Sequence, residues 1–160
     1  MTELVPMRDA DFNAFIAEAV PTYAADKVRA GQWTEDESLA LSKQSFDALL
    51  PQGLATPGHR VFSLVDEHQA VVGVLWIAEQ TRAGRQIAYV YNIRIAPSHQ
   101  RRGHAWRALR ALEAKLPSLG LSGIALHVFG HNTAATALYE KLGYLPTNIM
   151  MFKDVGRGDA

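Results

Sequence analysis

The stretch 87–105, IAYVYNIRIAPSHQRRGHA, decides how the chain around it is organised. Its apolar run ends at Pro97, a polar turn with two adjacent arginines follows, and Gly103 leads directly into a helical pattern. In this order of strand, basic loop and helix, backbone N–H groups gather at the start of a helix, where the helix dipole favours negative charge. The segment therefore predicts an anionic ligand that carries linked phosphates.

The composition limits the classes of protein to consider. The chain has 160 residues, a formal net charge of zero and no cysteine. The length fits one domain with its own core, and we expect that domain to span residues 1–155, followed by a flexible tail at 156–160. A neutral chain argues against nucleic-acid binding. The lack of cysteine excludes disulfides, thiolate-bound zinc and a thiol nucleophile, and we expect no bound metal.

Two further absences concern location. No basic region with a long apolar run stands at the N-terminus, and no apolar run approaches the roughly 20 residues that a membrane helix needs. We therefore expect a cytoplasmic protein without a membrane partner.

Three apolar runs predict neighbouring strands in the middle of the chain. They cover residues 61–65, 70–77 and 87–95 and are separated by short polar turns. Connections this short predict an antiparallel meander. A helical pattern at 105–116 separates the third run from another run at 124–129. Because a helix connects them, this last pair of strands should be parallel.

Capping and helix-breaking residues predict the remaining elements. Thr34 and Glu37 have the spacing of a capping box, which places a helix over residues 35–50. Pro21 should break or kink the first helical pattern, so that a separate piece follows it at 22–30. The other expected elements are a first strand at 4–7, a helix at 133–142 that ends at Gly143, and a last strand or strands at 144–152. This order predicts a single α/β or α+β domain.

The six residues Gln100–Ala105 form the first motif with chemical content. Gly103 lets the backbone approach a ligand closely, and the small Ala105 leaves room at the helix start. Arg101 and Arg102 can add charge-assisted hydrogen bonds to phosphate oxygens. The spacing matches neither the G-x-G-x-x-G of dinucleotide sites nor the P-loop of NTPases. A solvated basic helix start is the alternative interpretation.

The segment 127–144, HVFGHNTAATALYEKLGY, forms the second motif. Asn132 follows a strand, where its amide can bond backbone-like groups of a ligand, and Tyr139 can donate its phenolic proton to a leaving thiolate. Each has a structural alternative. Asn132 can simply cap a helix, and Tyr139 can be a core aromatic with its hydroxyl at the edge.

At this separation, the two motifs together resemble the GCN5-related N-acetyltransferases, and in particular their small single-domain bacterial members. Q-R-R-G-H-A is similar to that family's acetyl-CoA pyrophosphate loop, Q/R-x-x-G-x-G/A, and I-R-I-A-P resembles its pantetheine-binding strand. The family's C-terminal signature is matched at Asn132, Ala135, Leu138, Tyr139, Lys141, Leu142, Gly143 and Tyr144. The resemblance is sharp from 87 to 144 and looser from 4 to 77.

The resemblance implies a fold, an acetyl donor and a direct reaction. The fold would be a mixed, mostly antiparallel central sheet flanked by helices, with a splayed parallel strand pair. Acetyl-CoA would enter the splay, and an amine would attack its thioester while Tyr139 protonates the thiolate. His104 would add a donor near phosphate or, alternatively, be exposed to solvent. The residues implied to hold the donor are Ile93, Arg94, Ile95, Gln100, Arg101, Arg102, Gly103, His104, Ala105, Asn132, Ala135 and Tyr139.

The general base is the open part of this mechanism. Many members of the family carry an acidic residue in the central strand, where this chain has Tyr91 and Asn92. A neutral His127 in the next strand can serve as base, since the reference pKa of histidine is about 6.5. The alternative is a hydrogen-bonded strand histidine. Glu79 is a further candidate, with an edge-exposed carboxylate as its structural alternative.

The acceptor is expected to be a primary amine of a small molecule or a peptide. Residues before and within the meander are candidates to line its side of the site, and core packing is the alternative for the aromatic ones. These residues are Tyr23, Trp33, Trp76, Tyr91 and Asn92. The resemblance also allows a homodimer.

A competing function is an acetyl-CoA-binding sensor or regulatory module without catalysis. The missing carboxylate near Asn92 favours this alternative, whereas the retained Tyr139 and Asn132 argue against it.

Overall fold

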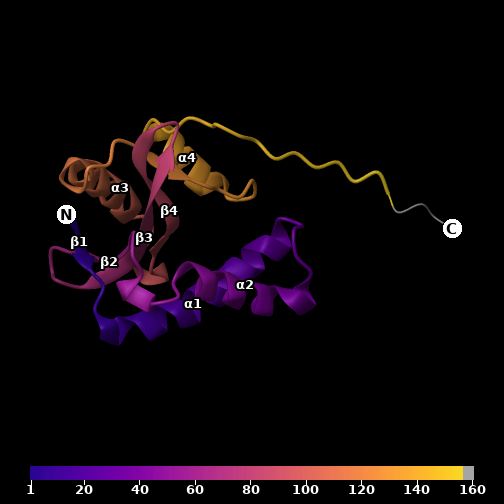
Figure 1. Ribbon diagram of the computed structural model, residues 1–160, viewed down its shortest axis with the longest axis horizontal. Helices are drawn as coiled ribbons and strands as arrows, with labels where there is room; N and C mark the ends of the chain where they lie inside the picture. The colour runs from indigo at the N-terminus through magenta and orange to yellow at the C-terminus, as the bar shows by residue number, and fades with distance from the viewer. Residues whose placement is uncertain (157–160) are drawn as a thin grey trace.

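The computed structural model describes residues 1–156, which form one five-stranded sheet with helices on both of its faces (Figure 1). The strands lie side by side in sequence order: β1 (Thr2–Pro6), β2 (His59–Asp66), β3 (Val71–Arg82), β4 (Arg85–Ile95) and β5 (Ile124–Leu126). Strands β1 to β4 are antiparallel, and β5 is parallel to β4. The predicted meander and the predicted parallel pair are therefore confirmed, although β5 is shorter than expected.

Four α-helices complete the fold: α1 (Asp9–Arg29), α2 (Glu35–Leu49), α3 (His104–Lys115) and α4 (Thr133–Lys141). Short 3-10 turns lie at Gly53–Ala55, Pro97–His99 and Leu116–Leu119. The capping box before α2 is formed, because the Thr34 N–H donates to a Glu37 carboxylate oxygen at 3.1 Å. Within residues 1–156, no helix is long and apolar enough to cross a membrane.

The prediction that Pro21 divides the first helix is wrong, because α1 continues through it. Hydroxyl groups give the carbonyls around the proline additional partners. Thr22 Oγ1 donates to the Glu18 carbonyl at 2.8 Å, and the buried Ser42 Oγ donates to the Val20 carbonyl at 2.6 Å. Neither bond replaces the one that Pro21 cannot donate to the Ala17 carbonyl, and packing of one buried face, on both sides of the proline, offsets that loss.

The core has two parts, one on each face of the sheet. The part beneath α3 includes Leu64, Leu75 and Leu112, while the part beneath α1 and α2 includes Phe15 and Trp76. Figure 1 shows the two helix layers on opposite sides of the sheet, with α3 and α4 on one side and α1 and α2 on the other.

The strand predicted at 144–152 is not formed in this chain. Residues 145–156 contain no assigned helix or strand, and Figure 1 shows them leaving the domain as an extended segment. A strand needs a neighbouring strand to pair its backbone groups, and this segment runs away from the sheet. Of the tail predicted at 156–160, residues 157–160 lie outside the described residues.

Candidate functional site

A β-bulge in β4 sets which side chains face which helix layer. The pairing register with β3 shifts between Trp76 and Ile77, so that Val90 and Asn92 are paired while Tyr91 has no partner. Val90 and Ile93 both pack in the core beneath α3, although they are three positions apart and side chains in a regular strand share a face only at even spacings. The bulge therefore turns Asn92 to the α1 side and keeps Ile93 on the α3 side. The sequence reasoning did not find this bulge.

The splay between β4 and β5 leaves part of β4 without a neighbour. The parallel pairing covers only Ala88–Val90 against Ile124–Leu126. Further along, the Ala96 N–H donates to the Val72 carbonyl in β3 at 2.8 Å. Because backbone groups alternate in direction along an antiparallel strand, those of residues 93 and 95 point away from β3 toward the splay. The part of β4 that the sequence analysis assigned to the acetyl donor, residues 93 and 95, thus has backbone groups without a partner strand.

A pocket of about 390 Å³ lies along this free edge, between the start of α3 and helix α4. It brings together most of the residues that the sequence analysis had assigned to a donor site. Its lining consists of Ile93, Ile95, His99, Gln100, Arg101, Gly103, His104, Ala105, Trp106, Asn132, Ala134, Ala135, Leu138 and Tyr139. Of the expected set, the side chains of Arg94 and Arg102 do not line it.

The loop before α3 is held in a conformation that presents backbone groups. Arg101 and Gly103 both have left-handed backbone angles, with φ of 62° and 79° respectively, and Gly103 is the N-cap of α3. The Gln100 side-chain amide donates to the Ile95 carbonyl at 3.1 Å and ties the loop to β4. The first N–H groups of α3 have no acceptor within the helix. They are therefore available to an anion at the pocket, in line with the helix dipole.

A partly buried hydrogen-bond cluster fixes this loop against β1. Arg107 in α3 donates through Nη2 to the Arg102 carbonyl at 2.7 Å and through Nε to Thr2 Oγ1 at 3.2 Å. His104 Nδ1 lies 3.0 Å from Thr2 Oγ1 and 3.3 Å from Arg107 Nη2. A guanidinium can only donate, so we assign Nδ1 as an acceptor and place the ring proton on Nε2. We call Thr2, His104 and Arg107 the loop brace.

The loop brace shows that one expectation about His104 is wrong, and it adds two residues to the candidate site. His104 is buried, so the alternative of a solvent-exposed histidine is wrong. Neither Thr2 nor Arg107 was expected at the site. They are 105 residues apart in the chain, and no local pattern connects them.

Helix α4 forms the opposite wall of the pocket. Asn132 caps it, since Oδ1 accepts the Ala135 N–H at 3.2 Å, and the same residue lines the pocket. Tyr139 is buried within α4, and this burial raises the pKa of its phenol above the ordinary value. The neighbouring Tyr144 lies with its ring centre 5.6 Å from that of Tyr139, and its buried hydroxyl has no hydrogen-bond partner within residues 1–156.

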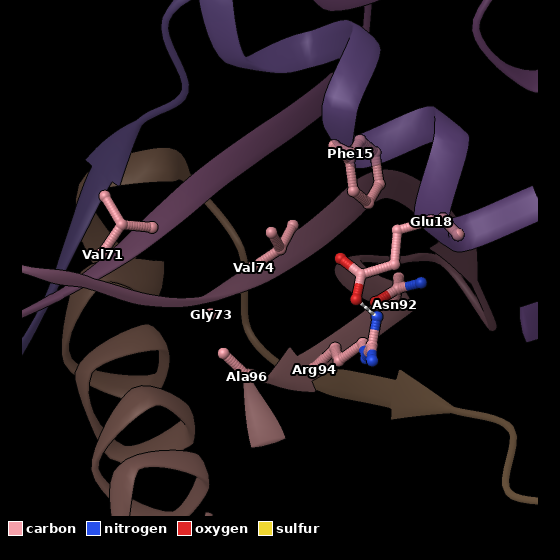
Figure 2. A pocket seen from close by; sticks show the side chains of 9 residues that line it. Phe15, Glu18, Val71, Gly73, Val74, Asn92, Arg94 and Ala96 are labelled. Carbon is pink, nitrogen blue, oxygen red and sulfur yellow. Dashed lines mark ion pairs between the residues drawn. The ribbon is translucent and has the colours of Figure 1, made fainter. Parts of the chain in front are cut away.

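A second pocket of about 150 Å³ opens on the α1 side of β3 and β4 (Figure 2). Arg94 and Asn92 reach into it from β4, and Glu18 reaches in from α1 to form an ion pair with Arg94. Phe15 and Val74 supply apolar wall. The bulge explains this placement, because it turns residues 92 and 94 toward α1. The Arg94 side chain is therefore committed to this second pocket, and only its backbone belongs to the splay.

The aromatic residues expected on the acceptor side divide into two groups. Tyr23 and Trp33 meet edge to face with ring centres 5.6 Å apart, and the Lys27 ammonium lies 5.6 and 5.2 Å from the two rings. Trp76, in contrast, is only 1 % exposed, and its indole N–H donates to His59 Nδ1 at 3.0 Å. The structure thus places Trp76 in the core rather than on the acceptor side.

The candidate bases lie apart from Tyr139. His127 follows β5 and contacts Phe129 edge to face, with ring centres 4.9 Å apart. Desolvation, and to a smaller extent the nearby Lys27 charge, lower the pKa of His127. His127 does not line the pocket that contains Tyr139. Glu79 forms an ion pair with Arg60 at 3.6 Å and lines neither pocket.

The segment between β5 and α4 carries a second histidine, His131, whose contact with Asp26 was not expected from the sequence. His131 Nε2 lies 3.3 Å from the Asp26 carboxylate in α1, and the His131 ring stacks on Phe129. These contacts tie the chain between β5 and α4 to the helix layer beneath the sheet.

Comparison with known proteins gives the same family at the level of sequence and of structure. The model of the acetyltransferase (GNAT) family matches residues 24–144. The uncharacterized N-acetyltransferase YycN of Bacillus subtilis (strain 168) is 37% identical over 150 residues, which are 94% of this chain and 96% of that protein. The uncharacterized N-acetyltransferase YdgE of the same organism is 31% identical to this chain over 152 residues, which are 95% of this chain and 97% of that protein. A crystal structure of YycN superposes with a TM-score of 0.94 at 36% identity, covering 98% of this chain and all of that one.

The loop brace can be tested through the pKa of His104. Burial, with a smaller contribution from the Arg107 charge, lowers this pKa. An unfolded histidine titrates near about 6.5. As the pH falls through that value, the unfolded chain takes up a proton that the folded chain does not. Stability from neutral His104 is therefore complete above about pH 6.5 and is lost as the pH falls through the folded pKa.

We expect the His104 ring to titrate below about 6.5 in an NMR pH series. The free energy of unfolding in urea should fall less steeply with acidification in His104→Gln than in the unmodified chain. A His104 ring that titrates at or above the unfolded value would contradict the assigned neutral state.

Proposed function

The chain belongs to the acetyltransferase (GNAT) family, and from that premise we propose that it transfers the acetyl group of acetyl-CoA directly to a primary amine of a small molecule or peptide. One observation carries the proposal. A single pocket of about 390 Å³ has the N-terminus of α3 and its glycine loop on one wall and the buried Tyr139 on another. A phosphate cradle and a proton donor are two of the groups that this reaction would use.

The pocket lining fits acetyl-CoA in chemical terms. The pyrophosphate would be held by the free N–H groups at the start of α3, with the side chain of Arg101 adding charge. The pantetheine arm would pair with the free backbone edge of β4 at Ile93 and Ile95 as a pseudo-strand. The Ile95 carbonyl already accepts from Gln100, which leaves its N–H and both groups of Ile93 for this role. When bound, acetyl-CoA supplies an acetyl group activated as a thioester.

Tyr139 is proposed as the general acid. An acid must be protonated before the leaving group departs, and burial raises the pKa of Tyr139, so that its phenol keeps the proton at physiological pH. Its position in α4 puts Tyr139 on the wall of the pocket that the thioester would enter.

His127 is proposed as the base. Its lowered pKa keeps the ring neutral at physiological pH, and a neutral ring can take the proton from the incoming ammonium, which leaves a free amine to attack the thioester. It follows β5 directly, on the side of the splay that faces Tyr23 and Phe129. In this arrangement the base and the acid act from opposite sides of the splay, the base on the incoming amine and the acid on the leaving thiolate.

The acceptor is proposed to approach over Tyr23 and Trp33. The faces of aromatic rings attract cations, and these two rings already contact the ammonium of Lys27. A protonated amine would find the same attraction before it passes its proton to the base.

The reaction can be tested by measuring thiol release from acetyl-CoA with a panel of primary amines. We expect release that depends on the amine, together with a product that is heavier by one acetyl group in mass spectrometry. Binding of acetyl-CoA without amine-dependent release from any member of a broad panel would favour the sensor function instead.

The acid role of Tyr139 can be tested with a matched pair of variants. Tyr139→Phe should lower kcat by about 100-fold or more, the range of general acid–base catalysis, and leave the KM for acetyl-CoA nearly unchanged. Tyr144→Phe is the control, because it removes a neighbouring buried hydroxyl that has no hydrogen-bond partner. Equal kcat values for the two variants would rule out the acid role.

The phosphate cradle can be tested with two glycines that share a left-handed backbone. Gly103 has φ of 79°, and a Cβ there would lie 2.8 Å from Arg107 Nη1, whereas Gly31 has φ of 75° and open space around it. Both alanine variants carry similar backbone strain, but only Gly103→Ala disturbs the loop. We expect Gly103→Ala to weaken acetyl-CoA binding at least about tenfold, which is about 1.4 kcal/mol.

The readout is the rise in melting temperature on adding acetyl-CoA. Gly31→Ala should keep the ligand-induced rise of the unmodified chain, measured from its own melting temperature. An unchanged rise in Gly103→Ala would remove the loop from the binding site.

A further inference from the structure

One large aromatic side chain stands free at the pocket of about 390 Å³, which we call the donor pocket. Trp106 lines this pocket from the first turn of α3, yet 40 % of the residue is exposed. The other two tryptophans are engaged, since Trp33 meets Tyr23 edge to face and Trp76 donates its indole N–H to His59. Within residues 1–156, the Trp106 indole has neither an aromatic partner nor a hydrogen-bond partner. A free aromatic face beside a pocket suits a planar ligand group.

The position of Trp106 in α3 places it beside the proposed phosphate cradle. It is the third residue of the helix, in the turn whose N–H groups have no acceptor within the helix. The two residues before it offer no free aromatic face. The His104 ring is buried and held in the loop brace, and Ala105 carries only a methyl group. Trp106 therefore supplies the aromatic surface at the start of α3.

The size of the donor pocket indicates which part of acetyl-CoA would meet this surface. Acetyl-CoA consists of an acylated pantetheine arm, a pyrophosphate and a 3′-phosphoadenosine, joined in that order. Ligand pockets measure about 300–1,000 Å³, and this one lies near the lower end of that range. With the arm along Ile93 and Ile95 and the pyrophosphate at Gly103, the adenosine would come to lie at the rim. A side chain that lines the pocket and is also 40 % exposed, as Trp106 is, stands at that rim.

We propose that the Trp106 indole stacks on the adenine ring of acetyl-CoA and makes the chain prefer the whole coenzyme to its phosphopantetheine part. The inference rests on the proposed function, because it takes acetyl-CoA as the donor. Stacking of a base on an aromatic side chain strengthens binding by about one to two orders of magnitude. The adenine lies far from the reacting bond and is unchanged by acetyl transfer. The contact is therefore uniform binding, which lowers the KM for acetyl-CoA and leaves kcat unchanged.

Calorimetric titration with CoA and with 4′-phosphopantetheine, which lacks the adenosine, gives the first test. The unmodified chain should bind CoA at least about tenfold more tightly than 4′-phosphopantetheine. Trp106→Ala should weaken CoA binding by about the same factor and leave 4′-phosphopantetheine binding unchanged, whereas Trp106→Phe keeps a flat ring and should retain most of the affinity for CoA. Leu39→Ala is the matched control. It removes another exposed apolar side chain, 57 % exposed on α2 and outside both pockets, and should leave CoA binding unchanged.

Tryptophan fluorescence gives a second readout that needs no acceptor amine. CoA should quench the emission of the unmodified chain far more than 4′-phosphopantetheine does, and Trp106→Phe should lose this quenching while it still binds CoA.

Two results would overturn the inference and leave the proposed reaction intact. One is unchanged CoA binding in Trp106→Ala. The other is equal weakening of CoA and 4′-phosphopantetheine in that variant, which would mean that the substitution disturbs the phosphate cradle and not an adenine contact. An unmodified chain that binds neither ligand would overturn the inference and the proposed function together.

Discussion

The early separation of β5 from β4 is the constraint on which the rest of the structure depends. A parallel pair that continued would use the backbone groups of residues 93 and 95 within the sheet. Because pairing ends at Val90 and Leu126, those groups face a pocket instead. Buried backbone groups must find partners, so a ligand or water has to complete this edge. The starts of α3 and α4 border the same opening, and their residues complete its lining.

Two further features allow β4 to contribute to both faces of the sheet. The bulge at Tyr91 keeps Ile93 above the sheet while Asn92 and Arg94 turn below it, where Glu18 neutralises the arginine. The loop brace then fixes the start of α3 by bonding it to Thr2 in β1. Together they separate the pocket bordered by α3 and α4, where we propose that acetyl-CoA binds, from the side next to α1, where we propose that the acceptor approaches.

The sequence predicted the features that depend on neighbouring residues. The glycine N-cap of α3, the capping box at Thr34 and the cap at Asn132 are all local, and local rules describe them. Prediction from the sequence failed where residues far apart in the chain determine the structure. α1 continues through Pro21, where the local rule ends it, because its buried face packs on both sides of the proline, and Ser42 in another helix bonds the Val20 carbonyl. Trp76 meets His59 across the sheet and becomes core, and the bulge shows only in the pairing with β3.

Residues 145–155 show a different reason why prediction from the sequence fails. Their alternating apolar residues predict a strand, yet a strand exists only when its backbone is paired, and a sequence pattern does not say which chain supplies the partner. Strand β5 is short for the same reason, since its outer edge lacks a neighbour within residues 1–156. Because residues 145–156 run away from the sheet, the outer edge of β5 has no partner strand among the described residues, and the segment that carries His127 continues directly from that edge.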